Sequence, residues 1–268
     1  MRSGSEVRSR GPVIIHPTAI IHPDAELGEG VEVGPYAIIA GTVKIGDRTR
    51  VGARVSVEGH TTIGSDNELF TGAVIGSKTQ DKKYDGGTSY LKIGDHNAIR
   101  EYVTINPGTK EGTETVIGSN NLLMAYSHVA HDCVIQDHAI LANQATLAGH
   151  VIIEDRALIG GLSAVHQFVR IGTLALVGGC SKVTQDIPPY IMTDGHPARA
   201  YGINAVGLDR AGFSKEEKAL LKKAFKIIFK SRLALKSAIA KLKQDCEPSP
   251  ALAVLLEFLE KSERGICR

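Results

Sequence analysis

Three histidines in the middle of the chain are spaced as the members of one site would be. His131, His150 and His166 lie 19 and 16 residues apart. An imidazole has an ordinary pKa of about 6.5, so it takes up and releases a proton near neutral pH. Three such side chains on one edge of a protein suit proton transfer with a substrate. In their neutral form they also suit a metal ion.

Acyl transfer is the first chemistry that this pattern favours. A neutral histidine would deprotonate a substrate hydroxyl, which would then attack a thioester while backbone N–H groups hold the oxyanion. Asp132 directly follows His131, where a carboxylate can orient the imidazole and stabilise its cation. Gly149 precedes His150, where it can bring a bare N–H close to a developing oxyanion. Direct attack needs no serine or cysteine nucleophile.

Two other classes compete with acyl transfer. Zinc chemistry, as in the hexapeptide-repeat carbonic anhydrases, could use three histidine ligands. Those enzymes carry paired histidines five residues apart, and this sequence has no such pair. A purely structural solenoid would have regular outer faces, whereas this chain has irregular faces, two insertions and a basic C-terminal part.

A strict six-residue repeat explains how distant histidines can meet. Every sixth residue from Ile117 to Val183 is a branched aliphatic, and the same phase begins at Ile15. A helix would repeat apolar residues every three to four positions and an exposed strand every two. A period of six is typical of a parallel β-helix, in which three sides close a coil of about 18 residues. Coils stack ~4.8 Å apart, so the three histidines should form a column.

The repeat also divides the chain. We expect a mainly β protein with a flexible tail at 1–12 and a β-helix over 13–189. The phase breaks twice, which predicts loop excursions at 77–92 and 110–115. Loops of this kind on a regular scaffold are often functional. The first one concentrates hydrogen-bonding side chains, among them Gln80, Asp81 and Lys83.

Residues 190–268 should form a connecting segment and a helical domain. Ser214 and Glu217 make a capping box before a helical stripe of apolar residues. Two further helices are expected near Leu233–Leu242 and Pro250–Lys261, on either side of a proline break. The period change from six to the helical spacing places the boundary near residue 189.

Charge is distributed unevenly along the chain. The net charge is only +2, but residues 210–243 hold eleven Lys or Arg against two Glu. Such a basic surface predicts an acidic partner. Nucleic acid is disfavoured because no aromatic stacking residues or binding motif accompany the lysines.

The sequence also indicates the cellular compartment. It contains no long apolar run or signal-peptide pattern, so we expect no membrane insertion. Its four cysteines lack the spacing of a disulfide framework, which favours a reducing, cytoplasmic setting.

Several segments resemble one known family. They are similar to segments of the UDP-N-acetylglucosamine acyltransferases of lipid A biosynthesis. In this chain the similar segments are NLLMAYSHVAHDC at 121–133, LAGHV at 147–151, AVHQF at 164–168, GGCS at 178–181 and GLDRAGFS at 207–214. The resemblance extends over nearly all of residues 13–268, both excursions included. The repeat alone is shared by many transferases, but this combination of motifs is specific.

The resemblance implies a left-handed β-helix followed by a helical bundle, assembled as a homotrimer with active sites between subunits. It implies transfer of a 3-hydroxyacyl group from acyl carrier protein to the glucosamine 3-position of UDP-N-acetylglucosamine, the first step of lipid A biosynthesis. The acidic carrier protein would be the partner of the basic helices. No cofactor or metal is implied.

The resemblance also assigns roles to individual residues. His131 matches the general base, Asp132 its orienting partner and Gly149 the oxyanion donor. Gly179 matches the position that sets acyl length. The matching positions for substrate, nucleotide or donor contacts are Gln80, Asp81, Lys83, His128, His150, His166, Gln167, Asn204 and Arg210.

Two positions depart from the family pattern. Asn106, followed by Pro107, stands where well-known members carry His-Arg, and Val206 replaces a glutamate in an Asn-x-Glu pattern. Both departures concern nucleotide contacts rather than the acyl-transfer centre. The related N-acyltransferases of lipid A assembly share the repeat but add an N-terminal uridine-binding domain, for which the residues before the first hexad are too few.

Overall fold

A computed structural model describes residues 11–268 of this chain. Most of the predicted tail, residues 1–10, lies outside the described residues, and Gly11 and Pro12 have no regular structure. The chain forms two compact units. Unit 1 ends at Asp132, and unit 2 comprises Cys133–Arg268.

Unit 1 consists of short parallel strands arranged in three sheets. Every third strand along the chain belongs to the same sheet, as expected of a coil with three sides. The first sheet contains β1 (Ile14–Ile15), β4 (Glu32–Val33), β7 (Arg50–Val51), β10 (Glu68–Leu69), β13 (Ala98–Ile99) and β16 (Leu122–Leu123). The second contains β2 (Ile20–Ile21), β5 (Ile38–Ile39), β8 (Ser56–Val57), β11 (Val74–Ile75), β14 (Thr104–Ile105) and β17 (His128–Val129). The third contains β3 (Glu26–Leu27), β6 (Lys44–Ile45), β9 (His60–Ile63), β12 (Tyr90–Ile93) and β15 (Glu114–Ile117).

The aliphatic residue of each hexad fills the core of unit 1. From β4 onward, the second residue of each two-residue strand is buried, whereas the first faces outward and is exposed or half-buried. Burying one Val, Leu or Ile side chain contributes about 1.5–3 kcal/mol. The six-residue repeat therefore fixes both the fold and its register, and the predicted left-handed parallel β-helix is confirmed.

The turns between strands use left-handed backbone conformations. Tyr102, Tyr126 and Asp132 have φ angles of 56°, 63° and 58°, values that are uncommon outside glycine. The conformation is compensated because these backbone N–H groups form hydrogen bonds. The N–H of Tyr126, for example, donates to the carbonyl of Glu101 over 2.9 Å. The corners of the coil are thus rigid platforms for the side chains that they carry.

A ladder of asparagines lies inside unit 1, among the coils that carry the excursions. The Asn97 side-chain amide donates to Asn67 Oδ1 over 3.0 Å and to the Gly118 carbonyl over 2.9 Å. The Asn121 backbone N–H in turn donates to Asn97 Oδ1 over 2.9 Å. Buried amides cost stability unless they are paired, so this ladder fixes the stacking of these coils.

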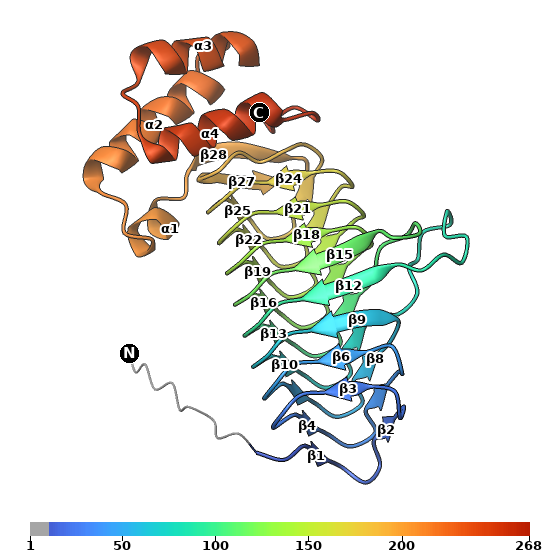
Figure 1. Cartoon of the computed structure of the whole chain (residues 1–268). Helices are drawn as coiled ribbons and strands as arrows, with labels where there is room; N and C mark the ends of the chain where they lie inside the picture. The colour runs from blue at the N-terminus through green and yellow to red at the C-terminus, as the bar shows by residue number, and fades with distance from the viewer. Residues whose placement is uncertain (1–10) are drawn as a thin grey trace. The chain divides into compact units, whose positions relative to one another are not determined.

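The two excursions project from the side of unit 1 (Figure 1). The first lies between β11 and β12, and the second lies between β14 and β15. Their C-terminal ends differ from the predicted limits, because Tyr90–Lys92 and Glu114–Thr115 belong to β12 and β15. These two strands pair along four residues rather than two, so the strand begins before the hexad phase resumes.

Unit 2 continues the same architecture and ends in helices. Its first sheet contains β19 (Ile140–Leu141), β22 (Leu158–Ile159), β25 (Leu176–Val177), β27 (Ile191–Gly195) and β28 (Ala198–Ile203). The second contains β20 (Thr146–Leu147), β23 (Ala164–Val165) and β26 (Lys182–Val183), and the third β18 (Val134–Ile135), β21 (Ile152–Ile153) and β24 (Arg170–Ile171). The helices are α1 (Ala205–Arg210), α2 (Lys215–Phe229), α3 (Leu235–Asp245) and α4 (Pro250–Lys261).

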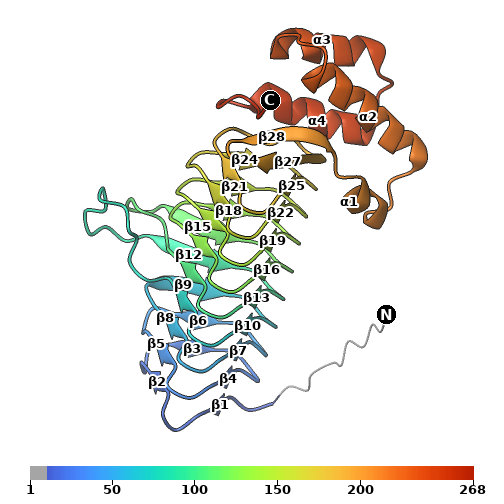
Figure 2. The same ribbon diagram turned by 180° about the vertical axis from the view of Figure 1, so that it is seen from behind.

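The C-terminal helices confirm most of the sequence prediction. Ser214 caps α2 with the predicted capping box to Glu217, and α4 has the predicted limits. Figure 2 shows α2 and α4 next to β28, with α3 packed on the side of these helices away from the strands. None of the helices within residues 11–268 is long and apolar enough to cross a membrane.

The segment that follows the last hexad is more ordered than predicted. Strand β27 pairs in parallel with β25 and antiparallel with β28, so the expected connecting segment is a hairpin followed by the short helix α1. The six-residue repeat, from which the strands were predicted, ends before this hairpin, so β27 and β28 were not predicted. The predicted domain boundary at residue 189 stays a prediction.

Candidate active site

His131 and Asp132 lie on the turn that follows β17 in unit 1. The left-handed conformation of Asp132 is held by its backbone N–H, which donates to Thr115 Oγ1 over 2.8 Å. This bond ties the turn to β15, which belongs to the third sheet. The turn therefore presents both side chains from a fixed backbone.

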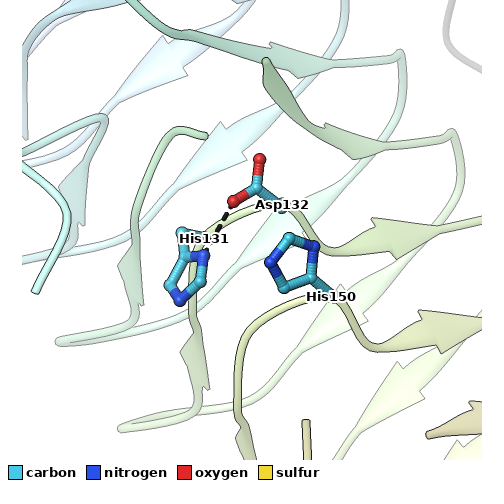
Figure 3. Close-up of side chains that lie close together, drawn as sticks. All are labelled: His131, Asp132 and His150. Atoms are coloured by element: carbon cyan, nitrogen blue, oxygen red, sulfur yellow. Dashed lines mark hydrogen bonds and ion pairs between the residues drawn. The ribbon is translucent and has the colours of Figure 1, made fainter. Parts of the chain in front are cut away.

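The two side chains form a hydrogen-bonded pair. His131 Nδ1 and Asp132 Oδ2 are 2.7 Å apart, and only 14% and 10% of the two side chains are exposed (Figure 3). An ionised carboxylate can only accept, so Nδ1 donates and the neutral ring keeps its lone pair on Nε2. A histidine in this tautomer, with a carboxylate behind it, can accept a proton at Nε2.

A second carboxylate faces the other side of the same ring. Asp81, from the first excursion, has Oδ2 3.6 Å from His131 Nε2. This distance is too long for a hydrogen bond, but it would stabilise an imidazolium. The sequence prediction that placed Asp81 at the site gains a geometric basis, because the long loop returns to the turn that carries His131.

The other predicted residues of the first excursion are more exposed. The Lys83 backbone N–H donates to Asp81 Oδ1 over 3.0 Å, which closes a small turn around that carboxylate. The side chains of Gln80 and Lys83 extend into solvent. These polar side chains are therefore accessible to a ligand beside Asp81.

His128 is the outward residue of β17 and is partly enclosed. Its Nδ1 lies 2.7 Å from Thr104 Oγ1, on the strand paired with it. Burial lowers the pKa of His128, so its imidazole is neutral at physiological pH. His128 therefore offers a hydrogen bond to a ligand rather than a positive charge.

Unit 2 carries His150 and His166 on turns that follow two strands of the second sheet. His150 (also drawn in Figure 3) stacks on Phe168, with ring centroids 4.6 Å apart and planes 14° apart. His166 lies two positions before Phe168 and is exposed, with Nδ1 3.1 Å from the Gln167 carbonyl oxygen. His150 and His166 thus follow neighbouring strands of the same sheet, as the predicted column requires, but Phe168 rather than His166 stacks on His150.

Phe168 takes this place because stacking follows the coil length and not the spacing between the histidines. Residues 18 positions apart occupy equivalent places, so the partner of His150 is Phe168. The Phe168 backbone N–H also donates to the Gly149 carbonyl over 3.2 Å, which fixes this corner. Sequence reasoning missed Phe168, although counting one coil length from His150 would have found it.

Gly179 lies on a different corner from these residues. It follows β25 of the first sheet, whereas Gly149, His150 and His166 follow strands of the second sheet. A Cβ added at Gly179 would meet only the Gly161 carbonyl oxygen, at 3.4 Å. The glycine therefore leaves an open surface that a larger side chain would occupy.

Comparison with known proteins identifies the family of this chain. The family model described as Udp N-acetylglucosamine O-acyltransferase, Domain 2, matches residues 186–267, and the bacterial transferase hexapeptide model matches residues 114–149. The acyl-[acyl-carrier-protein]–UDP-N-acetylglucosamine O-acyltransferase of Thermodesulfovibrio yellowstonii is 52% identical over 95% of this chain and 99% of its own length. The corresponding protein of Trichlorobacter lovleyi is 54% identical over 95% and 99%.

The chain belongs to the UDP-N-acetylglucosamine O-acyltransferase family. The solved structure of the family member from Bacteroides fragilis agrees, with a TM-score of 0.93 and 42% identity over 95% of this chain and all of that one. The resemblance inferred from the motifs is therefore confirmed across almost the whole sequence.

Two of the positions matched to the family's nucleotide or donor contacts lie at α1. Asn204 caps this helix: its Oδ1 accepts from the Gly207 N–H, and its Nδ2 donates to the Leu174 carbonyl, both over 2.9 Å. Both ends of the buried amide are thus bonded within the chain. Arg210, the last residue of α1, is exposed and available to a ligand.

The departures from the family pattern have different structural settings. Val206 is 61% exposed on α1, so the missing glutamate leaves an apolar surface there. Asn106 is buried, and its Nδ2 donates to the carbonyls of Ser77 and Lys78 over 3.0 and 3.3 Å. In this family member, Asn106 therefore anchors the first excursion.

Proposed function

We propose that this protein transfers a 3-hydroxyacyl chain from acyl carrier protein to the glucosamine 3-hydroxyl of UDP-N-acetylglucosamine, the first step of lipid A biosynthesis. The relatives from Thermodesulfovibrio and Trichlorobacter are named for this donor and this acceptor. The observation that carries the proposal is His131, held by Asp132 at 2.7 Å with Asp81 on the opposite side of its ring.

The proposed mechanism is direct attack of the sugar hydroxyl on the thioester, by addition followed by elimination and without an acyl-enzyme. His131 Nε2 takes the proton of the sugar 3-hydroxyl as its oxygen attacks the thioester carbonyl carbon. The Gly149 N–H donates to the oxyanion of the tetrahedral intermediate. The C–S bond then breaks, and the imidazolium returns its proton to the departing sulfur, so the products are an ester and the free thiol of the carrier protein. Asp132 stabilises the imidazolium between these two transfers.

The remaining residues would hold the substrates. We assign Gln80, Asp81 and Lys83 to the sugar nucleotide because Asp81 brings their loop within 3.6 Å of His131. Gly179 would set the acyl length. The other substrate contacts in this proposal are His128, His150, His166, Gln167, Asn204 and Arg210.

A homotrimer would complete the site. Tyr102 and Tyr126 follow first-sheet strands of unit 1, and they stack with ring centroids 5.2 Å apart while 46% and 57% exposed. Exposed stacked aromatic rings are typical of a surface that a partner covers. Gly179 also follows a first-sheet strand, so a neighbouring copy could bring its Gly179 corner to the acyl chain. We place the assembly in the cytoplasm, where the carrier protein would be met.

One preparation tests both activity and assembly. The protein is incubated with UDP-N-acetylglucosamine and a panel of 3-hydroxyacyl carrier proteins, with and without a metal chelator, and the products are identified by mass spectrometry. We expect a singly O-acylated sugar nucleotide at unchanged rate with chelator, and a trimer by light scattering. Loss of activity on chelation that zinc restores would favour the zinc alternative, and an active monomer would contradict the shared site. A 3-amino sugar nucleotide as the preferred acceptor would overturn the assignment of acceptor.

Helix α2 is the proposed docking surface for the carrier protein. Lys222 and Lys226 are exposed on this helix and Lys230 is exposed at its C-cap, whereas Lys223 reaches the carbonyl of Asp245 at the end of α3. Exposed charges interact over roughly 8–10 Å at physiological ionic strength, so such docking should weaken with salt.

Reversing Lys222 and Lys226 to glutamate should raise the KM for the acyl carrier protein and leave the KM for UDP-N-acetylglucosamine unchanged. The control is a variant with Lys44 and Lys92 reversed, which has the same net charge but is changed on β6 and β12 of unit 1. Steady-state kinetics at two salt concentrations provide the measurement. Equal KM values for the carrier protein in both variants would remove α2 from the docking surface.

A further inference from the structure

The two excursions of unit 1 meet through a buried pair of hydroxyl groups. Thr79 comes from the first excursion and Thr109 from the second, and their Oγ1 atoms are 3.2 Å apart. Only 6% and 4% of these residues are exposed, although both lie in loops. Buried polar groups persist where they are hydrogen-bonded, and a paired hydroxyl between two loops fixes one loop against the other.

Each hydroxyl partner is connected to one of the carboxylates beside His131. The Asp81 backbone N–H donates to Thr79 Oγ1 over 3.3 Å. The Thr109 backbone N–H donates to Asp132 Oδ2, also over 3.3 Å. This carboxylate oxygen is the one that accepts from His131 Nδ1.

These contacts form a closed circuit through the base. From His131 the circuit passes to Asp132, Thr109, Thr79 and Asp81, and returns to His131 Nε2. A displacement of either excursion would therefore change the position of one carboxylate relative to the ring. Reaction rates fall steeply when catalytic groups are misplaced by fractions of an ångström to one ångström.

We propose that the Thr79–Thr109 hydroxyl pair is a positioning element that keeps Asp81 and Asp132 on opposite sides of His131. This inference depends on the proposed role of His131 as the base. Neither threonine touches the reacting atoms in this proposal. Their effect on turnover is exerted through the two carboxylates.

The test uses replacements that change the hydroxyl and little else. Thr109→Val keeps the shape of the side chain and the backbone N–H that contacts Asp132, but it removes the hydroxyl. We expect kcat to fall roughly three- to tenfold, since a lost hydrogen bond of typical strength gives a factor of this size. The KM for the acyl carrier protein should not change. Thr109→Ser should restore kcat, because serine returns the hydroxyl.

A matched control separates positioning from general stability. Thr49 is fully buried in unit 1, and its hydroxyl donates to the Gly64 carbonyl over 2.8 Å. Thr49→Val removes a buried hydroxyl away from the site, so it should lower the melting temperature but leave kcat unchanged. If Thr49→Val and Thr109→Val lower kcat equally, the effect is loss of stability and the proposal is overturned.

The double variant Thr79→Val/Thr109→Val provides the decisive comparison. Thr79→Val also removes the acceptor for the Asp81 N–H, so it should lower kcat at least as much as Thr109→Val. If one bond links the two residues, the double variant should lose no more activity than Thr79→Val alone. Multiplicative losses, or a kcat for Thr109→Val within twofold of the parent, would overturn the positioning role. His131→Ala is assayed alongside: if it stays active, the base assignment fails, and if it is inactive beside a normal Thr109→Val, only the positioning proposal fails.

Discussion

His131→Ala should lower kcat by about 10²–10⁴-fold, the usual contribution of a positioned general base, and by more if the ring also stabilises charge. A sugar hydroxyl is a poor nucleophile near neutral pH, and direct attack leaves the removal of its proton to one group. The side chain is not part of the aliphatic core, so the assembly and the binding of UDP-N-acetylglucosamine should be preserved. Steady-state kinetics, light scattering and calorimetric titration with the sugar nucleotide measure these three properties.

The control for this variant is another histidine on a turn of unit 1. His96 is exposed and has a left-handed φ of 57°, a conformation that asparagine accepts. His96→Asn should therefore retain normal turnover. Near-full activity in His131→Ala would assign the base to another residue. His128 would then be the next candidate, since burial lowers its pKa and keeps its ring neutral.

Asp132→Asn should lower kcat by about 10- to 100-fold, because it replaces a charge-assisted hydrogen bond to His131 with a neutral one. Asparagine tolerates the left-handed backbone at this turn. Its side-chain oxygen can still accept from His131 Nδ1 and from the Thr109 N–H. The loss would therefore report the missing negative charge rather than a displaced ring.

Asp66→Asn is the matched control for this prediction. Asp66 has the same left-handed φ of 58° and accepts two hydrogen bonds from Arg48, over 2.9 and 2.6 Å. The replacement should lower stability slightly and leave kcat unchanged. An equal loss of kcat in the two variants would mean that Asp132 acts through the fold and not through His131.

The β-helix could be predicted from the sequence because a branched aliphatic residue recurs at every sixth position. Inward residues such as Leu123 and Val129 are fully buried, as the repeat requires. The capping box at Ser214 was equally local, since both of its bonds lie within four residues. Patterns that repeat, or that close over a few residues, can be identified without a structure.

The contacts around His131 could not be predicted in this way, because they join loops that follow no repeat. Thr79 and Thr109 are 30 residues apart in two loops that follow no repeat, so no period predicts that they meet. The approach of Asp81 to His131 depends on the same loops. The buried asparagine ladder at Asn97 was also missed, because a polar residue at a turn gives no sign of facing inward.

The stacking partner of His150 was missed for a more specific reason. The histidine spacings of 19 and 16 residues are close to one coil length, but in unit 2 it is residues 18 apart that occupy the same place on successive coils. His150 therefore stacks on Phe168, and His166 lies exposed beside it. The resemblance to the family assigned His150 and His166 to substrate contacts, and that assignment stays a prediction.

The central claim is that His131 and Asp132 act as one unit in direct acyl transfer. The most direct test is the kcat of the double variant His131→Ala/Asp132→Asn, compared with that of each single variant. Groups that act together are strongly non-additive: without the imidazole, the carboxylate has no cation to stabilise. The double variant should therefore be as slow as His131→Ala and no slower. A further 10- to 100-fold loss, equal to that expected for Asp132→Asn alone, would mean that the two side chains act independently and would contradict this account.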